Sequence, residues 1–190
     1  MDFERINALT LSHHIVKQTV KPGDLCIDAT AGRGNDTVFL CSLVGESGKV
    51  IAFDVQDAAV ESTRDRVAEC GYSGVAQVEK CSHSDMAKYA SNGTVACIMF
   101  NFGWLPGGDH NIHTNAQTSI AAIEQGLDLL KDGGLMSLCV YYGKETGFEE
   151  RDAILQYFKT IDQRVASVMV CDFVNRGNCP AIPVFIFKGK

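Results

Sequence analysis

The stretch "DLCIDATAGRGNDTVFLCSLV", residues 24–44, carries the pattern that decides the fold. It begins with an apolar run of strand length and ends, over 36–44, with apolar residues at helical spacing. The glycine loop "AGRG" lies between the two. A glycine turn between a buried strand and a helix brings backbone N–H groups close to a ligand and favours a negative group there. The stretch therefore predicts the first β-α unit of an α/β protein, with a ligand site at the carboxyl end of the strand.

The same alternation continues along the whole chain. Strands are expected at 24–30, 49–55, 75–80, 94–102, 135–142, 167–174 and 183–189, and helices at 12–20, 36–44, 57–70, 115–130 and 149–158. Several strands are apolar on both faces, as in a parallel sheet covered by helices on both sides. The last two are separated by "NRGNCPAI", which is too short for a crossover helix, so they should pair antiparallel. We predict a mainly parallel seven-stranded sheet with a C-terminal antiparallel hairpin and helices on both faces.

Composition narrows the class of protein. A chain of 190 residues fits one domain, 1–190, in which residues 1–23 form a helical cover before the first strand. Apolar residues make up 46% and charged residues 21%, which is typical of a globular protein and not of a disordered one. The net charge of -6 argues against a protein that binds nucleic acid through overall positive charge. With no leader pattern and no apolar run near ~18 residues, we expect a cytoplasmic protein.

The eight cysteines predict neither disulfides nor a metal site. No pair has C-x-x-C spacing, and most cysteines lie within apolar runs such as "DLCIDAT" and "VACIMF". A cysteine in that setting acts as a small buried apolar residue. Reduced structural thiols are therefore expected, with no bound metal.

The glycine loop differs from a dinucleotide-binding loop at one position. Gly32 and Gly34 are in place, but Thr37 stands where the third glycine of G-x-G-x-x-G belongs. Asp28 adds negative charge where a pyrophosphate would approach. The pattern disfavours a nicotinamide-dependent dehydrogenase and favours a ligand that carries an ammonium and one carboxylate.

Polar residues also follow the next strands. Asp54 ends the second strand, twenty positions after Gly34, where a carboxylate can accept both hydroxyls of a ribose. Ser82, His83 and Asp85 follow the third strand and could contact an adenine edge, although capping of the next helix is an equal alternative.

The fourth strand leads into the loop "NFGWLPGGDHNIHT", residues 101–114. Asn101 offers an amide donor and a carbonyl acceptor beside the glycine loop. Asp109, His110 and His113 could accept a proton, although solvated loop histidines are the alternative. Gly107 and Gly108 are expected to form a turn, and Trp104 is either a stacking surface for a base or a core aromatic.

Two tyrosines end the fifth strand, and two histidines lie on the first helix. Because side chains alternate along a strand, one of Tyr141 and Tyr142 should be core and the other should face the site. His13 and His14 either cover the ligand pocket or pack against the sheet.

These motifs together resemble the class I S-adenosylmethionine-dependent methyltransferases, which have a Rossmann-like fold. More narrowly, "DATAGRGNDT", "FDVQ", "NFGWLPGGDHNIHT", "TSIAAIEQGLDLL" and "GFEERDAI" resemble the small bacterial proteins described as rRNA methylases. The resemblance covers nearly the whole chain and departs at Cys81, where related sequences carry an acid. It implies S-adenosylmethionine as cofactor, held by Asp28, Gly32, Gly34, Asn35, Asp36, Asp54, Gln56, Ser82, His83 and Asn101.

The resemblance also implies a reaction. The family includes enzymes that methylate the amine of 5-aminomethyl-2-thiouridine at the tRNA wobble position. Catalysis would fall to Asn101 and Asp109, and substrate binding to Trp104, Gly107, Gly108 and Tyr142. The partner would be the anticodon region of tRNA, with Lys144, Arg151 and Arg176 as a basic rim, and a homodimer is left open.

Two alternatives stay open beside this reaction. The chain could methylate an amine of rRNA, of a protein or of a small molecule, or it could bind the cofactor without catalysis.

Overall fold

The computed structural model describes residues 6–103 and 115–189, and within residues 144–146 it describes the backbone alone. Strands and helices alternate along the chain as the sequence predicts. The elements are α1 (Ala8–Thr19), β1 (Leu25–Asp28), α2 (Asn35–Val44), β2 (Lys49–Asp54), α3 (Asp57–Glu69), β3 (Ala76–Lys80), the 3-10 helix η2 (His83–Lys88), β4 (Val95–Phe102), α4 (Ala116–Leu129), β5 (Leu130–Val140), α5 (Lys144–Phe158), β6 (Ala166–Val170) and β7 (Ile182–Lys188).

The described strands form one seven-stranded sheet in the order β3-β2-β1-β4-β5-β7-β6. The first five pair in parallel, while β7 runs antiparallel to both β5 and β6. The predicted mainly parallel sheet with an antiparallel C-terminal hairpin is therefore confirmed. The chain order reverses at β1, which lies between β2 and β4, so the crevice expected of such sheets opens at the carboxyl ends of these strands.

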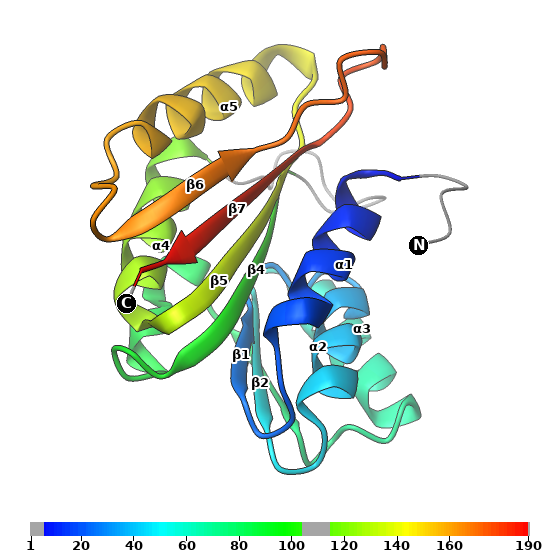
Figure 1. The fold of residues 1–190 in the computed structure, drawn as a ribbon. Coiled ribbons are helices and arrows are strands. Elements are labelled where there is room, and N and C mark those ends of the chain that lie inside the picture. Colours follow the sequence, from blue (N-terminus) through cyan, green and yellow to red (C-terminus); the bar gives the residue numbers. More distant parts are fainter. Residues whose placement is uncertain (1–5, 104–114, 190) are drawn as a thin grey trace.

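Helices cover both faces of the sheet (Figure 1). Alternation along each strand decides which face a side chain joins: Cys26 and Cys97 pack with Val16 and Leu40 from α1 and α2. Their neighbours Ile27 and Ile98 pack with Ile123, Leu129 and Ile154 from α4 and α5. Because both faces are buried, the central strands read as continuous apolar runs in the sequence.

Several element ends differ from the sequence prediction. Helix α1 begins four residues early, because Asn7 and Thr10 form a reciprocal capping box at its start. Helix α5 begins at Lys144 instead of 149, with Gly143 as its N-cap residue. Strand β5 begins at Leu130 instead of 135, since residues 131–134 bulge between the pairs Val95–Leu130 and Cys97–Leu135. Strand β6 ends at Val170, four residues before the predicted end.

All eight cysteines are free, and those at 26, 41, 97 and 139 are buried. Within residues 6–103 and 115–189, no helix is long and apolar enough to cross a membrane. Over the same residues, no three side chains of the metal-binding types gather closely enough to hold an ion.

Candidate active site

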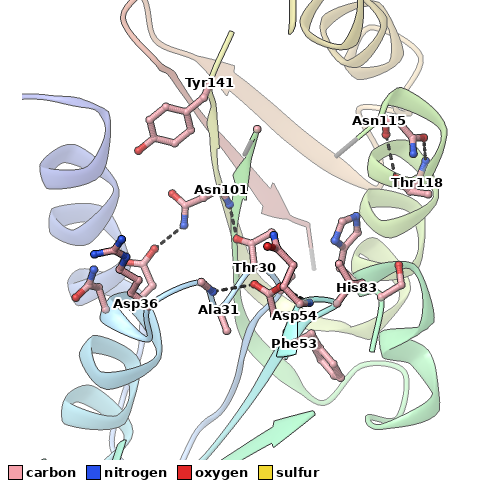
Figure 2. A pocket seen from close by; sticks show the side chains of 18 of the residues that line it. Thr30, Ala31, Asp36, Phe53, Asp54, His83, Asn101, Asn115, Thr118 and Tyr141 are labelled. Carbon is pink, nitrogen blue, oxygen red and sulfur yellow. Dashed lines mark hydrogen bonds between the residues drawn. The ribbon is translucent and has the colours of Figure 1, made fainter. Parts of the chain in front are cut away.

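A cavity of about 690 Å³ opens at the carboxyl ends of β1, β2 and β4. Its volume falls within the range of about 300–1,000 Å³ usual for small-ligand sites. Figure 2 shows that residues from several elements point toward it. Of the residues predicted from the sequence, those that line it are Gly32, Asn35, Asp36, Asp54, Gln56, Ser82, His83, Asn101 and Tyr142.

The glycine loop forms the tight turn that its sequence predicts. Gly32 and Gly34 both have positive φ, at 54° and 74°, and the N–H of Gly34 donates to the carbonyl of Ala31 at 2.7 Å. Gly34 does not line the cavity. A Cβ there would lie 3.0 Å from the Thr63 Cα, so this glycine permits close packing of α2 against α3. The two glycines thus have different tasks: Gly32 faces the ligand space, and Gly34 lets the helix behind it approach.

Asp54 is held against this loop by two backbone donors. One carboxylate oxygen accepts from the N–H of Gly32 at 2.9 Å, and the other accepts from the N–H of Gln56 at 3.0 Å. A carboxylate oxygen can accept more than one hydrogen bond, so Asp54 can still receive hydroxyl donors from the cavity side. Asp54 lines the cavity, and its predicted contact with a ribose stays a prediction.

Asp28 is placed differently from the prediction. Its side chain is fully buried and does not line the cavity; it accepts hydrogen bonds from the Thr37 hydroxyl at 2.6 Å and the Thr30 N–H at 3.2 Å. Burial, together with the negative charges of Asp36 and Asp54, raises its pKa to about 7. Asp28 therefore supports the loop from behind, and the cavity receives its negative charge from Asp36 and Asp54.

Asp36, in the first turn of α2, contacts Asn101, which lies near the carboxyl end of β4. The Asn101 side-chain amide donates to one oxygen of Asp36 at 2.7 Å, and its backbone N–H donates to the Thr30 hydroxyl at 2.7 Å (Figure 2). His13 from α1 lies 2.6 Å from the other Asp36 oxygen and stacks on Phe39. His13 thus neither lines the cavity nor packs only against the sheet. It contacts Asp36, which is a residue of the cavity wall.

The loop after the third strand contributes an uncharged wall that includes Ser82 and His83. Ser82 caps η2 by accepting from the N–H of Ser84, so the capping role also considered for it is real. The His83 ring lies edge-on to Phe100 and Phe102, and its buried Nε2 has no hydrogen-bond partner among the described residues. Burial lowers the pKa of His83 to about 4, so the ring is neutral near pH 7. A neutral ring adds no charge to this wall of the cavity.

The two tyrosines do not divide between core and site as predicted. Both Tyr141 and Tyr142 line the cavity, and Tyr141 is 41% exposed. The reason is that β5 ends at Val140, so strand alternation no longer governs the next residues. Partial burial still raises the pKa of the Tyr141 hydroxyl to about 12, which keeps it protonated.

Most of the loop at 101–114, from residue 104 onward, falls outside the described residues. Trp104, Gly107, Gly108, Asp109, His110 and His113 all belong to it. Their predicted roles stay predictions.

Sequence reasoning missed several residues of the cavity wall. Thr30 could have been found, because it lies between Asp28, the acid that ends β1, and the glycine loop. Cys179 comes from the β6–β7 loop, and Asn115 and Thr118 come from the start of α4. No local signal marks these three, since the fold alone brings their segments to the cavity.

Comparison with known proteins adds independent evidence. Residues 50–187 match the family model described as "Putative rRNA methylase". The chain is 34% identical, over 99% of its length and 71% of the relative, to the chloroplastic tRNA (mnm(5)s(2)U34)-methyltransferase of Arabidopsis thaliana.

Two solved structures share the fold closely. One is a "putative rRNA-methylase" from Clostridium thermocellum, with 43% identity and a TM-score of 0.94 over 97% of this chain and 98% of that one. The other is a "putative methyltransferase" from Streptococcus mutans in complex with SAH, with 34% identity and a TM-score of 0.87 over 97% and 99% of the two chains.

Proposed function

The chain belongs to the family described as "Putative rRNA methylase" and is an S-adenosylmethionine-dependent methyltransferase, and from that premise we propose that it methylates the amine of 5-aminomethyl-2-thiouridine at the tRNA wobble position. The observation that carries the proposal is the placement of Asn101 at the cavity wall, beside Asp36 and the glycine loop. The name of the Arabidopsis relative supports the choice of nucleoside.

The residues of the cavity fit this cofactor. Asp54 would accept the ribose hydroxyls, and the wall of Ser82 and His83 would receive the adenine. The acidic end at Asp36 suits the positive groups of the cofactor, because opposite charges attract most strongly where water is partly excluded. When bound, the cofactor supplies an electrophilic methyl group on a positively charged sulfur.

Asn101 is suited to position the acceptor amine. An alkylamine behaves like lysine, with a pKa near ~10.4, so releasing its proton near pH 7 requires on the order of 4 to 5 kcal/mol. Burial of the amine lowers this requirement, because burial disfavours the charged ammonium. A carbonyl oxygen that accepts an N–H of the neutral amine would then direct its lone pair into the cavity. Alignment of this kind can contribute about 7 to 11 kcal/mol to catalysis.

Asp109 is proposed as the proton acceptor for the leaving proton. It lies outside the described residues, so this role is carried by its place in the loop after β4. Trp104, Gly107 and Gly108 of the same loop are proposed to hold the base, together with Tyr142.

The anticodon arm is proposed to bind around the cavity mouth. Arg151 lies over the rings of Tyr142 and Phe148, at 4.7 and 4.9 Å, and Arg176 lies 4.1 Å from the centroid of Phe173. Surfaces that bind single-stranded nucleic acid combine positive charge with aromatic side chains on which bases can stack. The predicted rim therefore gains support at Arg151 and Arg176. A homodimer remains a prediction that sedimentation can test.

A comparison of acceptors tests the proposal. Methyl transfer from labelled S-adenosylmethionine would be measured with tRNA that carries 5-aminomethyl-2-thiouridine and with the same tRNA that carries unmodified 2-thiouridine. The proposal requires transfer to the first tRNA alone. Equal transfer to both would point to another amine, and cofactor binding without transfer to any tRNA, rRNA or protein would favour a non-catalytic module.

A further inference from the structure

A chain of three side chains connects α1 to the cavity. His13 contacts one oxygen of Asp36 at 2.6 Å, and the other Asp36 oxygen accepts from the Asn101 side-chain amide at 2.7 Å. The three residues come from α1, α2 and β4, which are separate elements of the chain. Side-chain exposure is 29% for His13 and 6% for Asp36, so the contact is largely removed from solvent.

The partners fix the direction of each hydrogen bond. An ionised carboxylate accepts and does not donate, so Asp36 requires a proton on His13 Nε2 and on the Asn101 nitrogen. The His13 ring cannot turn freely, because it stacks on Phe39 with centroids 3.9 Å apart and planes 9° apart. Asp36 is thereby held from one side while it orients the Asn101 amide on the other.

This arrangement decides which side-chain atom of Asn101 faces the cavity. An Asn side chain can present either its oxygen or its nitrogen, and the wrong choice here would bring two oxygens together. Because the nitrogen is committed to Asp36, the carbonyl oxygen is left to face the ligand space. In Figure 2 this oxygen points to the side of the cavity where Tyr141 lies.

We propose that His13 and Asp36 are positioning residues that lock Asn101 with its carbonyl oxygen toward the acceptor amine. This inference rests on the proposed function and adds that α1 takes part in catalysis. His13 itself does not line the cavity, so it acts through Asp36 and Asn101. The N-terminal helix is then a component of the active site as well as a cover for the sheet.

Kinetics of the full-length protein test this hydrogen-bonded series of His13, Asp36 and Asn101, called the relay below. His13→Leu removes the donor to Asp36 and is expected to lower kcat about tenfold, with the KM for S-adenosylmethionine changed by less than about twofold. His13→Gln keeps an amide donor near the position of Nε2 and should restore most of the lost rate. His14→Leu is the matched control, because His14 is the exposed neighbour on the same helix, and it should behave as the wild type.

A second measurement separates this inference from the proposed reaction. In ¹⁵N NMR spectra, the Asn101 side-chain amide protons should exchange slowly with water in the wild type and clearly faster in His13→Leu. Equal exchange in the two proteins, or a kcat that His13→Leu leaves unchanged, would overturn the relay. If the wild type transfers no methyl group to the aminomethyl nucleoside, the proposed reaction fails and the exchange measurement alone decides the relay.

Discussion

At the scale of single residues, three aspartates near one cavity have three different environments. Asp28 is buried behind the glycine loop, Asp36 joins His13 to Asn101, and Asp54 receives two backbone N–H groups while facing the cavity. The sequence predicts the positions of Asp54 and Asn101, since both stand at strand ends. It cannot predict the contact between Asp36 and Asn101, which depends on how two elements pack.

Asp54→Asn should weaken S-adenosylmethionine binding about ten- to a hundredfold, because the neutral amide loses the charge-assisted bonds proposed for the ribose hydroxyls. Isothermal titration calorimetry measures this directly. Asp57→Asn is the control, since Asp57 is exposed on the first turn of the next helix and pairs with Lys80. Equal affinities for Asp54→Asn and the wild type would remove Asp54 from the binding site.

His83 should make stability depend on pH. Folding lowers its pKa from 6.5 to about 4, so between these values the unfolded chain binds more protons than the folded chain. The contribution of His83 to the free energy of unfolding should therefore fall by on the order of 3 kcal/mol as pH drops from 6.5 to 4, while Asp28, with its raised pKa, contributes in the opposite direction. Urea unfolding should therefore show that the wild type loses stability relative to His83→Leu as pH falls through this window. An unchanged profile would show that His83 does not carry the effect, and His14→Leu serves as the exposed control.

At the scale of elements, the sequence predicts what each segment is better than where it ends. The hairpin of β6 and β7 follows from the short connection between two apolar runs, and the parallel strands follow from their apolar length. The ends of α1, α5 and β5 are decided by a capping box, a glycine cap and a bulge. These are local hydrogen-bond and backbone choices that hydrophobic periodicity does not reveal.

Gly34 provides a test of how α2 packs. Gly34→Ala places a Cβ at positive φ and 3.0 Å from the Thr63 Cα, and should destabilise the protein by about 2 to 4 kcal/mol. Gly71→Ala is a matched control, because Gly71 after α3 also has positive φ, in the left-handed region of a Schellman motif, but no atom lies within 4 Å of the added Cβ. Its cost should stay near ~1 kcal/mol. Equal losses in urea unfolding would mean that backbone conformation alone, and not helix packing, requires Gly34.

At the scale of the whole molecule, a net charge of -6 must be reconciled with the proposed tRNA substrate. The β6–β7 loop lies at the carboxyl edge of the sheet, since Ile182 at the start of β7 pairs with Val140 at the end of β5. Arg176 in that loop is therefore on the same edge as the cavity. A few local cations at this edge are enough for RNA contact without a basic protein overall.

Arg176→Gln should weaken tRNA binding and reduce the slope of log K against log salt concentration by about one unit. Filter binding over a salt series measures both quantities. Arg164→Gln is the control, because Arg164 precedes β6 at the opposite edge and pairs with Asp162. An equal effect of the two substitutions would indicate diffuse charge attraction instead of a defined rim.

The central claim, methylation of a wobble-position amine, is tested most directly by mass spectrometry of nucleosides. Full-length protein would be incubated with S-adenosylmethionine and tRNA that carries 5-aminomethyl-2-thiouridine, and the tRNA would then be digested. The account predicts that this nucleoside gains one methyl group with the wild type and much less with Asn101→Ala. A nucleoside that stays unmodified while the protein still binds S-adenosylmethionine would contradict the account.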